Sequence, residues 1–345
     1  MRAPGDGHHP DTLLARYRTM VMARAIERRL WVLDRLLPPH TVRRSRTGRE
    51  ATLAGVGQPT LAWTGFEAVQ AAAAAVLRPG VDWIVPCNRD LTLCLAAGMS
   101  PLAVMLAIFA RGSDPGSGGR QVPGAFGSRS ARIVMTSMLA GRHAVQAAGI
   151  AYASKVSGRD EVTLVCTDER GTLAGDWHEG INFAGAHSLP LICLVEDFAV
   201  GSSPIGDHGD ESPASRAQGY GLAAETIDGG DFDAALAAFG RAAARARSSA
   251  GPTLIHAAVP NLASSLPGGG RRPPEELEAL AAHDPIDRMR RRLAAAGILD
   301  SEADDRIQRD CAAEVEAAVE QARASAPPEG ALALQNVFSE EQVHG

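Results

Sequence analysis

Hydrophobic residues along the middle of the chain fall into two alternating patterns. Short unbroken apolar runs alternate with longer stretches whose apolar positions recur every three or four residues. The runs predict strands at 82–86, 162–166, 191–195, 223–227 and 253–258. The longer stretches predict helices at 66–77, 101–110, 142–154, 176–186, 214–218 and 232–248. Unbroken apolar strands suit a parallel sheet covered on both faces, so we expect an α/β fold with a doubly wound parallel sheet.

The two ends of the chain are predicted to be helical. An apolar helical face begins at Leu13 and Tyr17, and the helix spans 11–37 until Pro38-Pro39 ends it. The stretch 40–59, rich in Arg, Thr and Gly, is expected to be an irregular loop, and charged amphipathic helices are expected at 284–296 and 301–324. The predicted organisation is a disordered leader at 1–10, an α/β domain with an N-terminal helical arm at 11–270, and a helical C-terminal tail at 271–345.

Composition narrows the functional class. A net charge of −6 over 345 residues argues against a protein that binds nucleic acid or an anionic membrane. No apolar run reaches the roughly 18 residues that a membrane span needs. The five cysteines are dispersed without a CxxC pair, which predicts reduced, mostly buried thiols in a cytoplasmic protein.

Generic catalytic motifs exclude several enzyme classes. The chain has a single lysine, Lys155, within a predicted helix, so a P-loop ATPase is excluded. His178-Glu179 is followed by Asn182 rather than His, so there is no HExxH zinc motif, and no GxSxG nucleophile turn occurs. The stretch 112–127, dense in Gly, Ser and Pro, is too long for a plain connection and is a candidate functional loop.

Carboxylate pairs stand where a parallel sheet binds ligands. Asp168-Glu169 and Glu196-Asp197 each follow a predicted strand, and ligands of such sheets lie at the carboxyl ends of the strands. The segments of interest are therefore 167–171 and 196–203, followed by 259–270. The alternative is that these carboxylates only form solvated turns at the strand ends.

Several segments together carry a family resemblance. Residues 175–184, GDWHEGINFA, followed by Leu189-Pro190-Leu191-Ile192, resemble the thiamine-diphosphate motif region of alpha subunits of 2-oxo acid dehydrogenases, in their first, decarboxylating component. The loop 117–124, SGGRQVPG, looks most like the branched-chain branch. Further matching segments are Tyr17-Arg18-Thr19-Met20, Gly65-Phe66-Glu67-Ala68, Arg89-Asp90, Phe126-Gly127-Ser128-Arg129 and Asp284-Pro285-Ile286.

This resemblance implies a fold, a reaction and partners. It implies the thiamine-diphosphate-binding fold, with thiamine diphosphate and Mg²⁺ held between this alpha subunit and a beta subunit in an α₂β₂ tetramer. The implied activity is oxidative decarboxylation of a branched 2-oxo acid, an oxidoreductase reaction that passes the acyl group to the lipoyl arm of an acyltransferase. In the family the alpha subunit grips the diphosphate and its Mg²⁺, and the beta subunit supplies the glutamate that activates the cofactor.

The resemblance also places the metal ligands. The family's metal-binding acid falls on Glu169, and the two glycines beside it become Asp168 and Arg170. The metal-binding asparagine falls on Phe198, with Asp197 in place of its neighbour, and a backbone carbonyl ligand falls on Val200. One gap in this turn would move the acid position to Asp168 or Arg170.

The cofactor contacts follow in the same way. Arg89 keeps the phosphate-binding arginine, although Asn88 replaces the tyrosine before it. The stretch beside the thiazolium becomes Met138-Leu139-Ala140, and the active-site histidine position falls near Ser265, which leaves the catalytic residue unknown. Arg170 could replace Mg²⁺ as the counter-charge of the diphosphate. Arg120 is a candidate anchor for the cofactor or an anionic substrate.

Other singled-out residues have two readings each. His143 is either a ligand contact or an exposed residue in the first turn of its helix, and Glu67 is either structural or part of the site. His178 and Glu179 are expected to serve packing, His187 to lie on the surface, and His256 to be a hydrogen-bonded interior residue.

Two alternatives to a working subunit remain open because the cofactor contacts are so altered. The chain could be a non-catalytic scaffold or regulatory homologue that has lost Mg²⁺ and diphosphate binding. It could also be a pocket repurposed to bind another anion through the same arginines.

Overall fold

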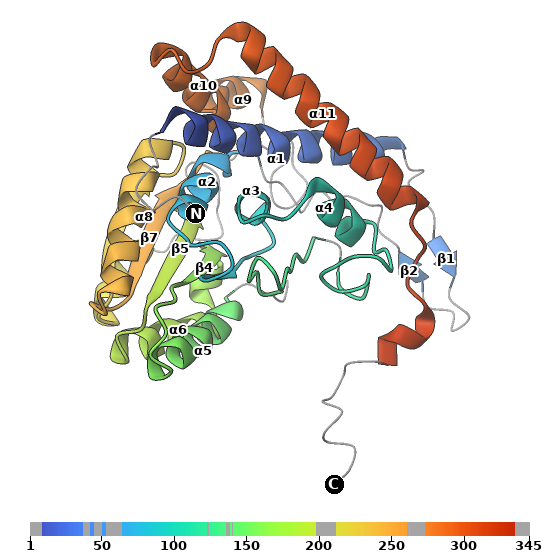
Figure 1. The fold of residues 1–345 in the computed structure, drawn as a ribbon. Coiled ribbons are helices and arrows are strands. Elements are labelled where there is room, and N and C mark those ends of the chain that lie inside the picture. Colours follow the sequence, from blue (N-terminus) through green and yellow to red (C-terminus); the bar gives the residue numbers. More distant parts are fainter. Residues whose placement is uncertain are drawn as a thin grey trace.

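The computed structural model describes residues 9–36, 42–44, 50–52, 64–122, 124–135, 139, 141–197, 212–260, 262 and 273–334. Its centre is a five-stranded parallel sheet with the strand order β3-β4-β5-β7-β6 (Figure 1). The strands are β3 (Trp83–Val85), β4 (Thr163–Asp168), β5 (Leu191–Asp197), β6 (Ala223–Asp228) and β7 (Thr253–Ala258). The predicted α/β fold with a parallel sheet is confirmed.

Helices cover both faces of this sheet. One face packs against α5 (His143–Val156), α6 (Gly175–Ala186) and α7 (Pro213–Gly219) through the apolar cluster around Val165 and Val195. The other face packs against α2 (Glu67–Ala75), α3 (Leu91–Ala96) and α8 (Phe232–Arg247) through the cluster around Leu164 and Leu194. The three strands β4, β5 and β7 are therefore buried on both sides, as unbroken apolar runs require.

The edge strand β6 departs from the predicted apolar run. Its residues alternate between partly and fully exposed positions, with only Ile227 buried. An edge strand has a neighbour on one side only, so Glu225 can reach outward and pair with Arg241 of α8.

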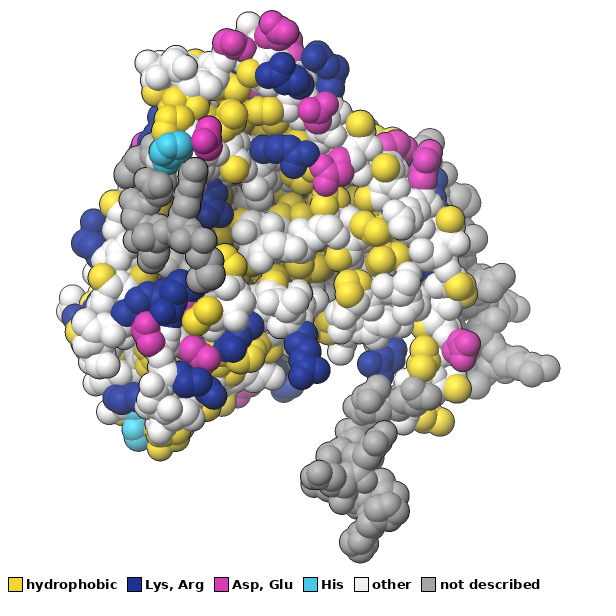
Figure 2. Space-filling view, in the orientation of Figure 1, with side chains coloured by type: hydrophobic (Ala, Val, Ile, Leu, Met, Phe, Trp, Pro, Cys, Tyr) yellow, Lys and Arg dark blue, Asp and Glu magenta, His cyan; other side chains and the backbone are white. Residues whose placement is uncertain are grey.

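A further layer of helices lies over α2 and α3. It contains α1 (Pro10–Leu36), α4 (Pro101–Ile108), α9 (Pro274–Ala281), α10 (Pro285–Ala295) and α11 (Ser301–Ala324), and α1 and α11 run across the top of the molecule in Figure 1. Acidic and basic side chains are interspersed along the outside of this layer (Figure 2). The ion pairs Arg18–Glu314 and Arg29–Glu316 link α1 to α11 across it. Two short 3₁₀ helices, η1 (Gly171–Leu173) and η2 (Gly330–Leu334), complete the described elements.

The structure corrects the sequence interpretation in three short segments. The stretch 40–59, expected to be an irregular loop, contains the antiparallel pair β1 (Val42–Arg44) and β2 (Glu50–Thr52). Helix α3 was not predicted from the sequence. The amide at its start, Thr92 N, donates a hydrogen bond to Gln70 Oε1 at 3.1 Å, and this residue is distant in sequence, so no local pattern indicates the helix start. Helix α9 was missed as well. It has only eight residues, too few to establish a period.

A buried arginine ties the helical layer to the α/β core. Arg24 of α1 donates to Glu67 Oε1 on α2 at 2.6 Å and to Asp284 Oδ2, just before α10, at 2.8 Å. Glu67 Oε2 also accepts from Gly65 N at 2.8 Å. Burial opposes ionisation of Asp284, but the hydrogen bond from Arg24 outweighs it and lowers the pKa of Asp284. Glu67 therefore has a structural role, which resolves the two readings of this residue.

Two simple expectations also hold. All five cysteines are free thiols; Cys87 is half-buried, and Cys94, Cys166, Cys193 and Cys311 are buried. Among the described helices, none is long and apolar enough to cross a membrane.

Removing Arg24 tests this link. Arg24→Met leaves the buried Glu67 and the half-buried Asp284 without their cation, so we expect the free energy of unfolding to fall by about 3–5 kcal/mol in urea titrations. Adding Glu67→Gln to Arg24→Met removes one of those charges and should recover part of the loss. The control is Arg18→Met, which breaks a half-exposed pair and should change stability by about 0–1 kcal/mol. An equal effect of the two single variants would contradict the role given to Arg24.

Glu161 provides a pH test. Burial opposes its ionisation, but hydrogen bonds from Ser154, Trp83 and Arg132 outweigh it and lower the pKa of Glu161 to about 2. The resulting stabilisation is present above the unfolded pKa of 4.5 and is lost as the pH falls from there towards 2. We expect Glu161→Gln to lower the unfolding free energy by about 1–3 kcal/mol at pH 7 and by less at pH 3. Glu225→Gln, at an exposed pair, is the control; a pH-independent loss in Glu161→Gln would refute the assignment.

Candidate functional site

The connections that leave β3 and β4 diverge at the carboxyl edge of the sheet. The segment after β3 leads to α3 on one face, whereas the segment after β4 leads through η1 to α6 on the other face. Parallel sheets bind ligands where neighbouring connections separate in this way. Arg89, Glu169 and Arg170 lie in these two connections and Asp168 ends β4, so these sequence-predicted residues stand at one edge of the sheet.

A buried polar network lies on the α2–α3 side of this edge. Gln70 Nε2 donates to Glu196 Oε1 at 2.9 Å, to Asp90 Oδ1 at 3.3 Å and to the carbonyl of Arg89 at 3.0 Å. Asp90 Oδ2 accepts from Cys87 N at 2.7 Å. Ligand atoms of Cys87, Asp90 and Glu196 lie within 4.8 Å of one another. The network fixes the backbone on both sides of Arg89 and thereby positions the Cα atom from which the Arg89 side chain extends.

The two carboxyl groups of this network lie close together in a buried environment. Burial raises the pKa of both Asp90 and Glu196, and the two groups hydrogen-bond to each other. Burial and the neighbouring Asp90 also raise the pKa of the Cys87 and Cys166 thiols, so these cysteines are unreactive at neutral pH. Sequence analysis singled out Glu196 but missed Gln70. The signal for Gln70 was a polar residue at a position buried by the alanine face of α2.

A second group of charges lies on the α5–α6–α7 side of the same edge. Glu169 is 5 % exposed, and its Oε2 has no hydrogen-bond partner. Burial and the repulsion of Asp168 and Asp197 raise the pKa of Glu169 to about 7. Arg170 Nε lies 3.9 Å from Glu169 Oε1, which makes a long ion pair rather than a hydrogen bond.

His256 and Asp197 form a pair between neighbouring strands. His256 Nε2 on β7 lies 2.9 Å from Asp197 Oδ2 at the end of β5. His256 is buried, so the prediction of a hydrogen-bonded interior residue is confirmed. Its partner is the carboxylate that stands next to the family's metal-binding position.

The turn after β4 is built by close backbone approach. Gly171 N donates to Asp168 Oδ1 at 2.8 Å, and Thr172 Oγ1 donates to the carbonyl of Glu169 at 2.6 Å. A side chain at Gly171 would place its Cβ 2.0 Å from Thr167 Oγ1, and one at Gly141 would place its Cβ 2.5 Å from the carbonyl oxygen of Gly171. These two glycines therefore allow the start of α5 and the turn after β4 to come together.

The structure settles the readings of the remaining histidines. His143 is not exposed: it is buried, its Nε2 contacts the carbonyl oxygen of Cys166, and burial lowers its pKa. The start of α5 packs directly on β4, which explains its burial. His178 Nδ1 lies 2.6 Å from the Tyr220 hydroxyl, consistent with packing. Glu179 is exposed, so the expectation that it serves packing is wrong, whereas His187 lies on the surface as predicted.

The arginine candidates differ in their surroundings. Arg89 is half-buried, with its guanidinium carbon 6.0 Å from the Phe66 ring centroid. Arg120 is exposed in the loop 112–122, where its Nε donates to the carbonyl of Ser117 at 2.8 Å. Asp114 organises that loop by accepting from Ser117 N at 2.9 Å. Met138, Ala140, Phe198, Val200 and Ser265 lie outside the described residues, and Leu139 is exposed.

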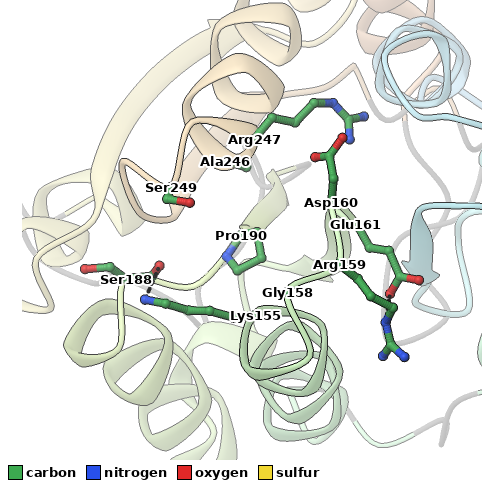
Figure 3. Close-up of a pocket in the computed structure, with 10 residues that line it drawn as sticks. All are labelled: Lys155, Gly158, Arg159, Asp160, Glu161, Ser188, Pro190, Ala246, Arg247 and Ser249. Carbon is green, nitrogen blue, oxygen red and sulfur yellow. Dashed lines mark hydrogen bonds and ion pairs between the residues drawn. The ribbon is translucent and has the colours of Figure 1, made fainter.

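A cavity of about 270 Å³ lies at the opposite, amino edge of the sheet (Figure 3). Its cations are already engaged: Lys155 Nζ donates to the carbonyl of His187 at 2.6 Å, Arg159 pairs with Glu161, and Arg247 pairs with Asp82. Three helices end around it, after Val156, Ala186 and Arg247, and cations are favourable at helix C-termini. These charges are therefore explained by the fold, and the candidate site remains the carboxyl edge.

Comparison with known proteins identifies the family of this chain. The dehydrogenase E1 component family matches residues 59–330. The chain is 33 % identical to the 2-oxoisovalerate dehydrogenase subunit alpha of Bacillus subtilis, over 92 % of each chain. It is 29 % identical to the pyruvate dehydrogenase E1 component subunit alpha of Acholeplasma laidlawii, over 88 % of this chain and 82 % of that one. It is also 30 % identical to the alpha subunit of acetoin:2,6-dichlorophenolindophenol oxidoreductase of Cupriavidus necator, over 72 % of this chain and 75 % of that one.

The close approach at Gly171 can be tested by stability. Gly171→Ala places a methyl group against Thr167 Oγ1, so we expect a loss of about 1–3 kcal/mol in unfolding free energy. Adding Thr167→Ala removes the obstructing hydroxyl and should recover part of this loss. Gly175→Ala is the matched control, because nothing lies within 4 Å of its Cβ position. If Gly171→Ala were as stable as Gly175→Ala, the turn would not be packed as described.

Proposed function

Because the chain belongs to the dehydrogenase E1 component family, we propose that it is the alpha subunit of a thiamine diphosphate-dependent enzyme that decarboxylates 2-oxo acids. The relative that it matches over 92 % of both chains acts on 2-oxoisovalerate by its name, which favours a branched 2-oxo acid as the substrate. The carrying observation is the carboxyl edge, where Arg89, Glu169 and Arg170 converge from the diverging connections of β3 and β4. Among the described residues, nothing favours a non-catalytic scaffold or a repurposed pocket.

The described residues fit the cofactor in chemical kind. A diphosphate requires cations, and Arg89 and Arg170 supply these. The buried Glu169 Oε2, with no hydrogen-bond partner, supplies the hard oxygen that Mg²⁺ prefers. When bound, thiamine diphosphate supplies a carbanion that attacks the 2-oxo group and accepts the electrons left by CO₂.

Each residue of this chain then has a binding or orienting task. Arg89 and Arg170 neutralise phosphate oxygens, and the network of Gln70, Asp90 and Glu196 holds Arg89 in place. Glu169 holds the cation. Arg120, an exposed residue of the loop 112–122, is proposed to contact a carboxylate of the substrate or the cofactor. Met138 and Ala140 beside the thiazolium, and the backbone carbonyl of Val200 as a metal ligand, remain proposals on resemblance alone.

The wider setting of the chain is proposed on the same basis. A beta subunit completes the cofactor site in an α₂β₂ tetramer, and a lipoyl acyltransferase accepts the acyl group. We place the complex in the cytoplasm, because the five free cysteines are typical of a reducing compartment. The domain limits remain those proposed from the sequence, with the α/β domain at 11–270 and the tail at 271–345.

Calorimetric titration tests the proposal. Thiamine diphosphate with Mg²⁺ is titrated into the chain co-purified with its beta subunit, and we expect micromolar binding. Arg89→Leu removes charge-assisted hydrogen bonds to phosphate, so the affinity should fall about 10–100-fold. Arg170→Ala should weaken binding in the same direction.

The control is Arg291→Gln, an exposed arginine on α10 that should leave the affinity unchanged. A stable complex that binds no cofactor would overturn the proposal and support a scaffold role. Cofactor binding that is indifferent to both Arg89→Leu and Arg170→Ala would contradict the roles given to these arginines.

A further inference from the structure

Asp197, at the end of β5, lies on the same face of the sheet as Glu169. The strands β4 and β5 pair with Asp168 opposite Glu196, so the next residues, Glu169 and Asp197, follow at neighbouring strand ends. Side chains alternate along a strand, and Val195, two residues before Asp197, lies in the cluster on the α5–α6–α7 face. Val165, four residues before Glu169, lies in the same cluster. Asp197 and Glu169 thus continue two rows of one face, and the charge of Asp197 acts on Glu169.

An unsatisfied buried oxygen points to a ligand at this place. Nearly all buried polar atoms in proteins have a hydrogen-bond partner. Glu169 Oε2 has no hydrogen-bond partner, although only 5 % of the residue is exposed. Arg170 does not satisfy it, because its Nε approaches the other oxygen, and only to 3.9 Å. Two carboxylates that follow each other at neighbouring strand ends, one with a buried oxygen that has no hydrogen-bond partner, offer the hard oxygen ligands that a divalent cation prefers.

His256 restricts the orientation of the second carboxylate. Its Nε2 engages Asp197 Oδ2 at 2.9 Å from the adjacent strand, where His256 pairs with Val195 in register. A hydrogen bond from a ring nitrogen to one carboxylate oxygen orients the other, which is how outer partners commonly orient metal-binding carboxylates. His256 and Asp197 both belong to central strands, so this pair is held rigidly.

We propose that Glu169 and Asp197 together bind the divalent cation of this site, and that His256 is a positioning residue for Asp197. The inference deepens the proposed function and rests on it for the identity of the site. In this assignment the Asp197 carboxylate, at the end of β5, takes the place of the asparagine that the resemblance puts at position 198. The bound cation would then face two protein carboxylates, with Arg170 beside it to offset part of their charge against a diphosphate.

Direct binding of Mn²⁺ tests this assignment without any activity measurement. Free Mn²⁺ is followed by electron paramagnetic resonance while the metal is titrated into the chain co-purified with its beta subunit, with and without thiamine diphosphate. We expect one site, with an affinity about 10–100-fold lower in both Glu169→Gln and Asp197→Ala. Asp197→Asn keeps an oxygen ligand and should be weakened less than Asp197→Ala. Asp176→Asn, an exposed carboxylate in the first turn of α6, is the matched control and should bind as the unaltered chain does.

The positioning role has its own readout. His256→Leu removes the hydrogen bond to Asp197 and should weaken Mn²⁺ binding by about 3–10-fold, in line with the loss of an outer partner. His256→Gln keeps an N–H near the same place and should restore most of the affinity. A merely structural histidine would give equal losses in the two variants, and that result would overturn the positioning role.

The outcomes separate the inference from the proposed function. If thiamine diphosphate binds but Glu169→Gln and both Asp197 variants leave the Mn²⁺ affinity unchanged, the cation assignment is wrong and the function stands. If Mn²⁺ binding depends on both carboxylates while thiamine diphosphate does not bind, the function fails and the assignment stands. Absence of any Mn²⁺ site in the unaltered complex, with or without thiamine diphosphate, overturns the assignment. Thermal unfolding of each variant shows that the chain remains folded.

Discussion

All strands of the central sheet run in one direction, and this constraint decides where charge can collect. Parallel strands bring every carboxyl end to the same edge, so Arg89, Asp168, Glu169 and Asp197 meet there although they leave three different strands. Every helix that returns across the sheet ends at the opposite edge, where Lys155, Arg159 and Arg247 are held by carbonyls and carboxylates. The chemistry of the two edges therefore differs by construction.

A buried hydrogen-bond network centred on Gln70 lies beneath the site. Gln70 holds Asp90, Glu196 and the backbone of Arg89 in one buried network, and burial raises the pKa of both carboxyl groups. Removing a partner from such a network leaves an unsatisfied buried group, which is the costly case. Glu169 Oε2 and Glu196 Oε2 are both buried without a hydrogen-bond partner. Of these two residues, Glu169 follows its strand opposite Asp197, and we infer the ligand at that pair.

Charge balance at the site follows from its altered residues. Asp168 and Arg170 replace two glycines of the family pattern with one negative and one positive side chain, and Asp197 adds a further negative charge. His256 on the neighbouring strand accompanies Asp197. Arg170 lies 3.9 Å from Glu169, and His256 hydrogen-bonds to Asp197. The edge therefore combines positive and negative side chains, which suits phosphate and a divalent cation.

The sequence by itself determined the strands, most helices, the parallel sheet and the family, because apolar periodicity and contiguous motifs are local properties of the chain. It also named Arg89, Glu169, Arg170 and Asp197 as residues at strand ends. Only the tertiary structure decided which groups pair: Arg24 with Asp284, 260 residues away, Gln70 with Glu196, 126 residues away, and His256 with Asp197, 59 residues away. Such contacts are fixed when the sheet order closes long loops, and no local pattern records them.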